Sequence, residues 1–192
     1  MRRFVLVYGF IAGGVLAAMM VITGVFHRQI PIEAGEVIGY TTMVLAFLMV
    51  FLGVRSYREE VGGGTVSFGR ALGVGLGITL VAAICYVAAW EVVLPTLMAD
   101  FPERYQAHLM EQARASGATE AELARKAQEL AGFWQQYQNP LVRIGFTFLE
   151  PLPVGLVFSL LTAWIMSRRR PTHTPDSAPA PKPAPPHYAG GL

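Results

Sequence analysis

Four long apolar runs dominate the chain, and each is bounded by polar or charged residues. They extend over about residues 4–26, 37–54, 71–97 and 141–166. A helix rises about 1.5 Å per residue, so about 20 such residues match the roughly 30 Å hydrocarbon core of a bilayer. The pattern therefore predicts an all-α fold, an integral membrane four-helix bundle. The first run is also longer than the apolar core of a signal peptide, about 7 to 15 residues, which favours an uncleaved helix.

The polar segment between the third and fourth runs carries the start and stop signals of two further helices. Asp100, Pro102 and Glu103 are typical of a helix start, and they predict a helix over about residues 101–116 with Gly117 as its stop. A capping box at Thr119 and Glu122 opens a second helix over about residues 120–138. We expect an extracytoplasmic helical hairpin between spans 3 and 4.

One face of this hairpin is apolar, and two interpretations of it remain open. The two faces pack against each other and cap the bundle, or they form a surface for lipid or a partner. The apolar positions of the second helix are Leu123, Ala127, Leu130, Trp134 and Tyr137.

The distribution of basic residues predicts the orientation. Nine Lys and Arg residues fall on the side of the two termini, and six fall on the other side. The positive-inside rule then places the N-terminus and the C-terminus in the cytoplasm, which agrees with four spans. The net charge of +2 is too small to indicate nucleic-acid binding.

The chain divides into a membrane domain, residues 1–170, and a tail, residues 171–192. The tail holds seven of the thirteen prolines together with several alanines. This composition cannot build a core, so the sequence predicts a disordered cytoplasmic tail rich in Pro and Ala.

Small residues recur along one side of the first three spans. Close backbone approach at such positions drives helix association in lipid, so we expect a helix-packing role for Gly9, Gly13, Gly73 and Gly77. A contact with a second copy of the chain would use the same residues, and the sequence does not separate the two.

Two acids inside the apolar runs form a candidate intramembrane polar site. Glu91 lies near the outer end of the third run, and Glu150 lies about two turns into the fourth. A carboxylate at the bilayer centre costs about 2.5–3.5 kcal/mol on insertion scales, so it usually has a partner or a function. Pro151 and Pro153 free backbone carbonyls beside Glu150, which favours a small polar cavity.

Two roles for these acids stay open. The first is a proton, ion or ligand role, and the second is structural hydrogen bonding of Glu150 or Glu91 with Tyr86, Thr147 or each other, since both acids are expected at similar depth.

The sequence offers little that indicates catalysis. Four histidines are scattered without zinc-ligand spacing, Cys85 is the single cysteine, and neither a phosphate-binding loop nor a nucleophile elbow is present. We therefore predict no metal, no cofactor and no enzymatic activity.

Four segments of the chain carry a resemblance to a known family. They are GYTTMVLAFLMVFLGVRSYRE (39–59), GGTVSFGRAL (63–72), ASGATEAEL (115–123) and NPLVRIGFTFLEPLPVGLVFSLL (139–161). In these segments, which contain Arg55, Tyr57, Arg58, Glu150 and Pro153, the chain resembles the DUF4199 family of bacterial membrane proteins. The resemblance implies the same four-span layout and a place in the bacterial cytoplasmic (inner) membrane, and it implies no activity.

Three functions fit these features. A structural or accessory protein would act through partners, which are the lipid bilayer and a membrane protein or a second copy of the chain. A small transporter or channel component would use Glu150 and Glu91, although inverted repeats are not visible. A membrane-embedded enzyme is the third and has the least support.

Overall fold

The computed structural model describes residues 1–168, and the predicted tail lies outside them. Within this part of the chain the structure has seven α-helices and no strands. Four stretches are long and apolar enough to cross a membrane: α1, α2, α3, and α6 together with α7. This confirms the all-α, four-span prediction. The helices are α1 (Arg2–Val25), α2 (Ile32–Glu60), α3 (Phe68–Leu97), α4 (Phe101–Ala115), α5 (Glu120–Tyr137), α6 (Pro140–Leu149) and α7 (Pro151–Arg168).

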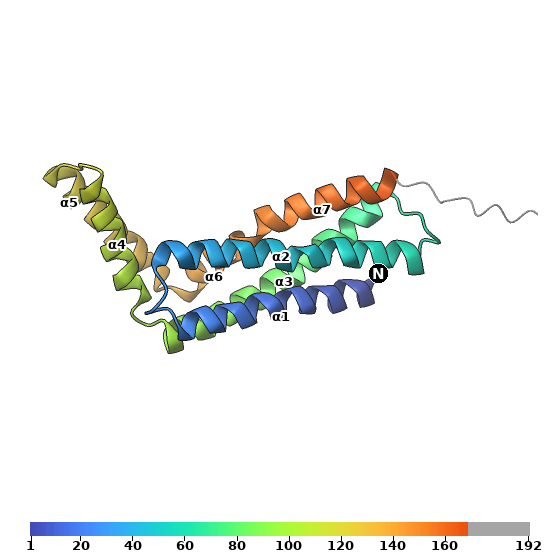
Figure 1. Cartoon of the computed structure of the whole chain (residues 1–192), viewed down its shortest axis with the longest axis horizontal. Coiled ribbons are helices and arrows are strands. Elements are labelled where there is room, and N and C mark those ends of the chain that lie inside the picture. Colours follow the sequence, from blue (N-terminus) through green and yellow to red (C-terminus); the bar gives the residue numbers. More distant parts are fainter. Residues whose placement is uncertain (169–192) are drawn as a thin grey trace, which may run out of the picture.

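The spanning helices run along the long axis of the molecule, and α4 and α5 lie together at one end (Figure 1). The second helix is much longer than its apolar run, because its polar ends are helical as well. Glu33 lies in its first turn and Arg58 in its last. Apolar length therefore marks the expected membrane core, and the helix continues beyond it at both ends.

The core of the bundle is tightly packed in the half that holds the N-terminus. The side chains of Phe47, Val50, Val54, Val74 and Ile78 are fully buried there. Large apolar side chains on the outside of the same helices are exposed, for example Phe10, Leu45 and Leu160. This arrangement is typical of helices that face lipid.

Glycines make the contact between α1 and α3 close. A Cβ atom at Gly9 would lie 2.6 Å from Val81, and one at Gly13 would lie 2.5 Å from Cys85. At Gly77 the glycine is on α3 and the side chain on α1, and a Cβ atom there would lie 3.0 Å from Val5. Along these two parallel helices, each therefore supplies glycines that face side chains of the other.

Two further glycines of α3 differ in what they contact: Gly73, which was expected to have a packing role, and Gly75, which was not. Gly73 faces only the flexible end of Met1, 3.2 Å from an added Cβ atom. The close approach of α3 to α7 occurs at Gly75, where a Cβ atom would lie 3.0 Å from Ser159. Ser159 also shares a hydrogen bond of 3.3 Å with Thr79. The sequence analysis did not single out this contact.

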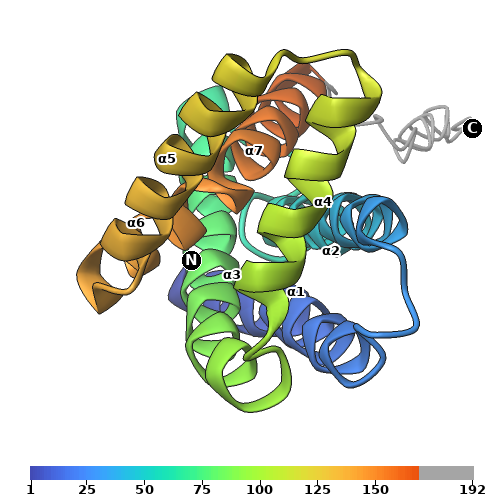
Figure 2. The ribbon, with the colours of Figure 1, turned by 90° about the vertical axis from the view of Figure 1, so that its left-hand side faces the viewer.

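The hairpin α4–α5 crosses the end of the bundle (Figure 2). Its second helix begins with the expected capping box, since Thr119 and Glu122 bond each other's backbone N–H groups. Gly117 ends the turn between the helices with a φ of +83°, a conformation that glycine adopts readily. Asp100 precedes α4 as expected, but its side chain makes no capping bond. It bonds the loop after α1 instead.

Candidate functional site

The fourth span is broken at Glu150. α6 ends at Leu149, and α7 begins at Pro151. Proline has no N–H to donate and its ring crowds the preceding turn, so Pro151 and Pro153 together interrupt the ladder of helical hydrogen bonds. The break changes the packing, because α2 packs along α7 but has little contact with α6.

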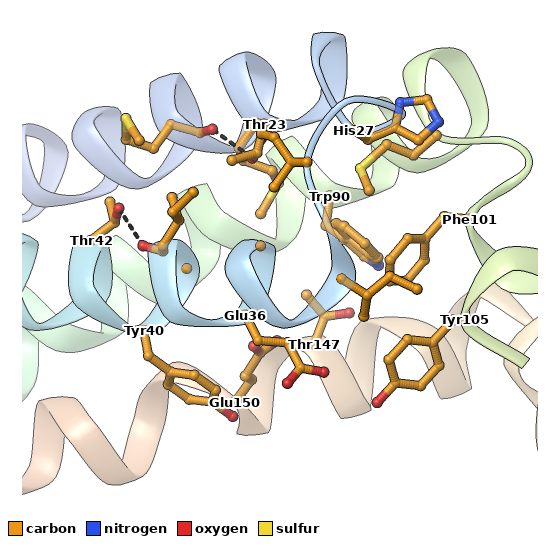
Figure 3. Close-up of a pocket in the computed structure, with 18 of the residues that line it drawn as sticks. Thr23, His27, Glu36, Tyr40, Thr42, Trp90, Phe101, Tyr105, Thr147 and Glu150 are labelled. Atoms are coloured by element: carbon orange, nitrogen blue, oxygen red, sulfur yellow. Dashed lines mark hydrogen bonds between the residues drawn. The ribbon is translucent and has the colours of Figure 1, made fainter. Parts of the chain in front are cut away.

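A cavity of about 540 Å³ lies where α6 and α2 are apart. It lies between α1, α2, α3 and α6 and extends beneath the start of α4. Figure 3 shows Glu36 from α2 and Glu150 from the helix break in the same space, with Tyr40 and Tyr105 near them. The other polar lining side chains are Thr23, His27, Thr42, Tyr86, Trp90, Arg104, Tyr137 and Thr147.

The cavity opens to the side of the bundle, between α2 and α6. Tyr40 lies eight residues, or about 12 Å, from the start of α2, well within the apolar part of the bundle. Its side chain is nevertheless 56% exposed. Glu36 and Glu150 are also exposed on this side. The cavity is therefore accessible from outside the bundle between α2 and α6.

Glu150 has one hydrogen-bond partner of the kind expected from the sequence. The Tyr86 hydroxyl donates to its carboxylate over 3.0 Å. This bond links α3 to the helix break. The other Glu150 oxygen has no hydrogen-bond partner among residues 1–168, and Glu150 lines the cavity.

Glu91 lies in a different environment. Arg143 donates to both of its carboxylate oxygens, and one of these bonds, from Nε, measures 2.8 Å. Both side chains are largely buried. Glu91 is absent from the cavity lining, and its partner lies seven residues, about 10 Å, along the helix from Glu150. The expectation that the two acids meet at similar depth is therefore wrong, because α6 presents a basic side chain opposite Glu91.

A third link between α3 and the outer helices lies beside the cavity. The indole N–H of Trp90 donates to the Tyr137 hydroxyl over 2.9 Å, and that hydroxyl lies 3.4 Å from the Thr147 hydroxyl. Trp90 also packs edge-on against Phe101, with ring centroids 6.1 Å apart. These contacts fix the aromatic wall of the cavity.

Glu36 is a site residue that the sequence analysis missed. It lies immediately before the second apolar run, where an acid reads as a helix-end residue. The structure places it in the cavity lining next to α4. Burial and the nearby Glu36 carboxylate raise the pKa of the Tyr105 hydroxyl. Only the packing of α4 over α2 brings these two groups together.

Polar contacts hold α4 over the mouth of the cavity. The His27 ring and Asp100 lie 2.7 Å apart, and Arg28 lies 3.1 Å from the second Asp100 oxygen. Arg104 donates to the His27 carbonyl over 2.8 Å. The bond with His27, helped by Arg28, lowers the pKa of the Asp100 carboxyl. These contacts tie the hairpin to the loop after α1.

The chemistry of the lining suits binding. Carboxylates and hydroxyl groups supply hydrogen bonds, and aromatic rings and methionines supply apolar walls. Within residues 1–168, no group of three His, Cys, Asp or Glu side chains is placed to hold a metal ion.

Comparison with known proteins gives the family and no closer relative. No curated protein and no solved structure matches the chain. The model of one family, described as protein of unknown function (DUF4199), matches residues 7–168, the four spans and the hairpin together. The chain therefore belongs to the DUF4199 family.

Proposed function

We propose that the protein is a membrane-embedded binding protein that takes a small amphiphilic molecule into the cavity beneath its hairpin. The observation that carries the proposal is the cavity itself, an apolar and aromatic space with two carboxylates in its lining. Ligand sites in proteins have this composition, with mostly apolar walls and a few polar groups that orient the ligand.

The expected orientation of the chain determines in which half of the membrane the cavity would lie. The positive-inside rule places both termini in the cytoplasm, and the hairpin and the cavity then belong to the outer half of a bacterial inner membrane. The ligand would enter from the outer leaflet or from outside the cell.

The packing of the other half favours a transporter component or a receptor over an open channel. Phe47, Val50 and Ile78 are fully buried there, and α3 meets α7 closely at Gly75. The bundle is closed below the cavity in this conformation. We propose that the cavity binds its ligand without catalysing a reaction.

Ligand binding can be tested with a reporter inside the cavity. Trp90 lines it, and the chain has only two other tryptophans, Trp134 and Trp164. A variant with Trp134→Phe and Trp164→Phe keeps Trp90 alone. We expect saturable energy transfer from Trp90 to the neutral dye N-phenyl-1-naphthylamine when the purified variant is titrated in detergent.

A matched pair of substitutions separates the cavity from the general apolar surface. Gly39 lines the cavity, and Gly14 faces outward from α1; an added Cβ atom meets no other atom within 4 Å at either. Gly39→Phe fills the cavity and should abolish the saturable signal, whereas Gly14→Phe should preserve it. Equal signals from the two variants would reject the proposed site.

A structural or accessory role through partners is the second candidate. The observation in its favour is an aromatic cluster at the hairpin end, where Phe133 stacks with Tyr137 and packs against Phe146 while staying 38% exposed. A photo-crosslinker at position 133 tests it in cells. A discrete protein adduct would support the role, and adducts with lipid alone would argue against it.

A further inference from the structure

Two carboxylates of the cavity differ from the other acids near it. Within residues 1–168, neither Glu36 nor Glu150 has a basic side chain at salt-bridge distance, whereas the neighbouring acids are paired. Glu91 pairs with Arg143, and Asp100 pairs with both His27 and Arg28. The cavity lining therefore contains two carboxylates, and no basic side chain of the described residues forms an ion pair with either.

The basic groups of the lining have other partners. Arg104 donates to the neutral His27 carbonyl at the end of α1 and keeps its positive charge, and the His27 ring bonds Asp100. Both lie where α4 begins. Among the lining residues within 1–168, the acidic side chains are Glu36 and Glu150.

Aromatic rings lie near the two carboxylates. Tyr40 and Tyr105 lie near Glu36 and Glu150 in Figure 3, and Tyr105 stacks on Phe101, which packs edge-on against Trp90. An aromatic face attracts a cation within about 6 Å of its centre, and tryptophan does so most strongly. Carboxylates and aromatic rings together form the kind of site that binds quaternary cations.

We infer that the cavity binds a lipophilic organic cation, with Glu36 and Glu150 as its counter-ions and Tyr40, Trp90 and Tyr105 as its aromatic walls. The inference rests on the proposed function, since it names the ligand class of the same cavity. The cation carries an ammonium or phosphonium centre on an apolar body. The apolar body matches the methionines and isoleucines of the lining, and the sideways opening admits it from the membrane.

Two probes of the same shape and opposite charge test whether the cavity prefers a cation or an anion. Tetraphenylphosphonium and tetraphenylborate each compete with N-phenyl-1-naphthylamine for the Trp90-only protein in neutral detergent micelles, with protein-free micelles as the baseline. We expect the phosphonium to displace the dye at a lower concentration than the borate.

Charge-neutral variants give the decisive comparison. Glu36→Gln and Glu150→Gln should each weaken phosphonium binding by about tenfold, since a unit charge a few ångströms away contributes at least that much in a partly buried site. The same variants should strengthen borate binding. Glu111→Gln, on the exposed side of α4, removes one charge outside the cavity and should change neither probe.

The outcomes separate the two proposals. A preference for the borate, or an equal loss of both probes in the Gln variants with dye binding intact, overturns the cation inference and leaves the cavity as a ligand site. If the wild-type chain shows no saturable signal with the dye or with either ion, the proposed function fails as well.

A further competition identifies the source of the cation. Lysophosphatidylethanolamine carries an ammonium group, and lysophosphatidylglycerol does not. Displacement of the phosphonium by the first lipid alone assigns the site to a lipid headgroup. If neither lipid displaces it, the site is assigned to a free organic cation.

Discussion

Glu91 and Glu150 are both intramembrane acids, yet the fold treats them differently. Glu91 is neutralised by a two-pronged contact with Arg143, and Glu150 has one phenolic partner and an open side. The sequence shows two acids in apolar runs and does not show which one a distant arginine will meet. The pairing depends on how α6 packs on α3, and that packing depends in turn on the helix break.

The Glu91 contact with Arg143 should hold α6 to α3. Glu91→Ala leaves a largely buried guanidinium without its partner, so we expect a loss of about 1–3 kcal/mol in the free energy of unfolding. Unfolding in mixed micelles with increasing dodecyl sulfate measures it. In a double-mutant cycle with Arg143→Met, the second substitution should cost much less once Glu91 is gone. Additive losses would show that the pair does not interact.

Asp100 gives the hairpin a dependence on pH. Its pKa is lowered in the folded protein, chiefly by the bond with His27, so its contribution to stability is present above the unfolded value of about 3.9. That contribution is lost as the pH falls from there through the lowered folded value.

Hydrogen exchange of α4 measures this effect. We expect α4 to exchange faster as the pH is lowered through this range, after correction for the intrinsic rate. Asp100→Asn should exchange faster already at neutral pH and respond less to acid. A wild-type acid response retained in full by Asp100→Asn would assign it to other groups.

At the scale of helices, the contact of α1 with α3 depends on the lack of side chains at particular turns. Gly13→Ala places a methyl group 2.5 Å from the Cys85 Cβ atom, and Gly14→Ala places one in open space. We expect Gly13→Ala to cost about 1–3 kcal/mol through overpacking. Gly14→Ala should be neutral or stabilising by up to about 1 kcal/mol, because alanine favours helix. The same unfolding titration compares them, and equal effects would contradict the packing.

Local signals predicted the helices well. The apolar runs, the Thr119 capping box and Gly117 each act within a few residues, and each appears in the structure at the expected place. The fourth apolar run was predicted as one span over about residues 141–166, with carbonyls freed beside Glu150, and the structure divides it there into two helices, α6 and α7.

The cavity could not be predicted in the same way. Its lining comes from six helices, α1 to α6, and from the segments between them, and its two carboxylates lie more than a hundred residues apart in the chain. Glu36 lies at the edge of an apolar run, where acids commonly occur, and nothing in the residues around it indicates that α4 will fold back over it. Asp100 likewise looked like a cap, and tertiary contacts with His27 and Arg28 took its side chain.

For the whole molecule, the proposed orientation gives a direct prediction. In a Cys85→Ala background, Ser116→Cys at the hairpin and Ser67→Cys before α3 each provide one exposed thiol. A membrane-impermeant maleimide added to intact cells should label position 116 and leave position 67 unlabelled until the membrane is permeabilised. The opposite pattern would invert the protein and place the cavity in the inner leaflet.

Because the cavity opens sideways between α2 and α6, the protein would respond to the concentration of ligand in the membrane and not to its concentration in water. A ligand that arrives through lipid is first concentrated there by partition, which gains about 0.8 kcal/mol for each CH₂ group it carries. Across a series of cations with lengthening alkyl chains, the dissociation constant referred to water should fall about fourfold per carbon even where the protein contacts stay the same. When the dissociation constants are calculated from the cation concentration in the membrane, they should be nearly the same for all chain lengths. Occupancy of the cavity would then follow the amount of cation in the bilayer.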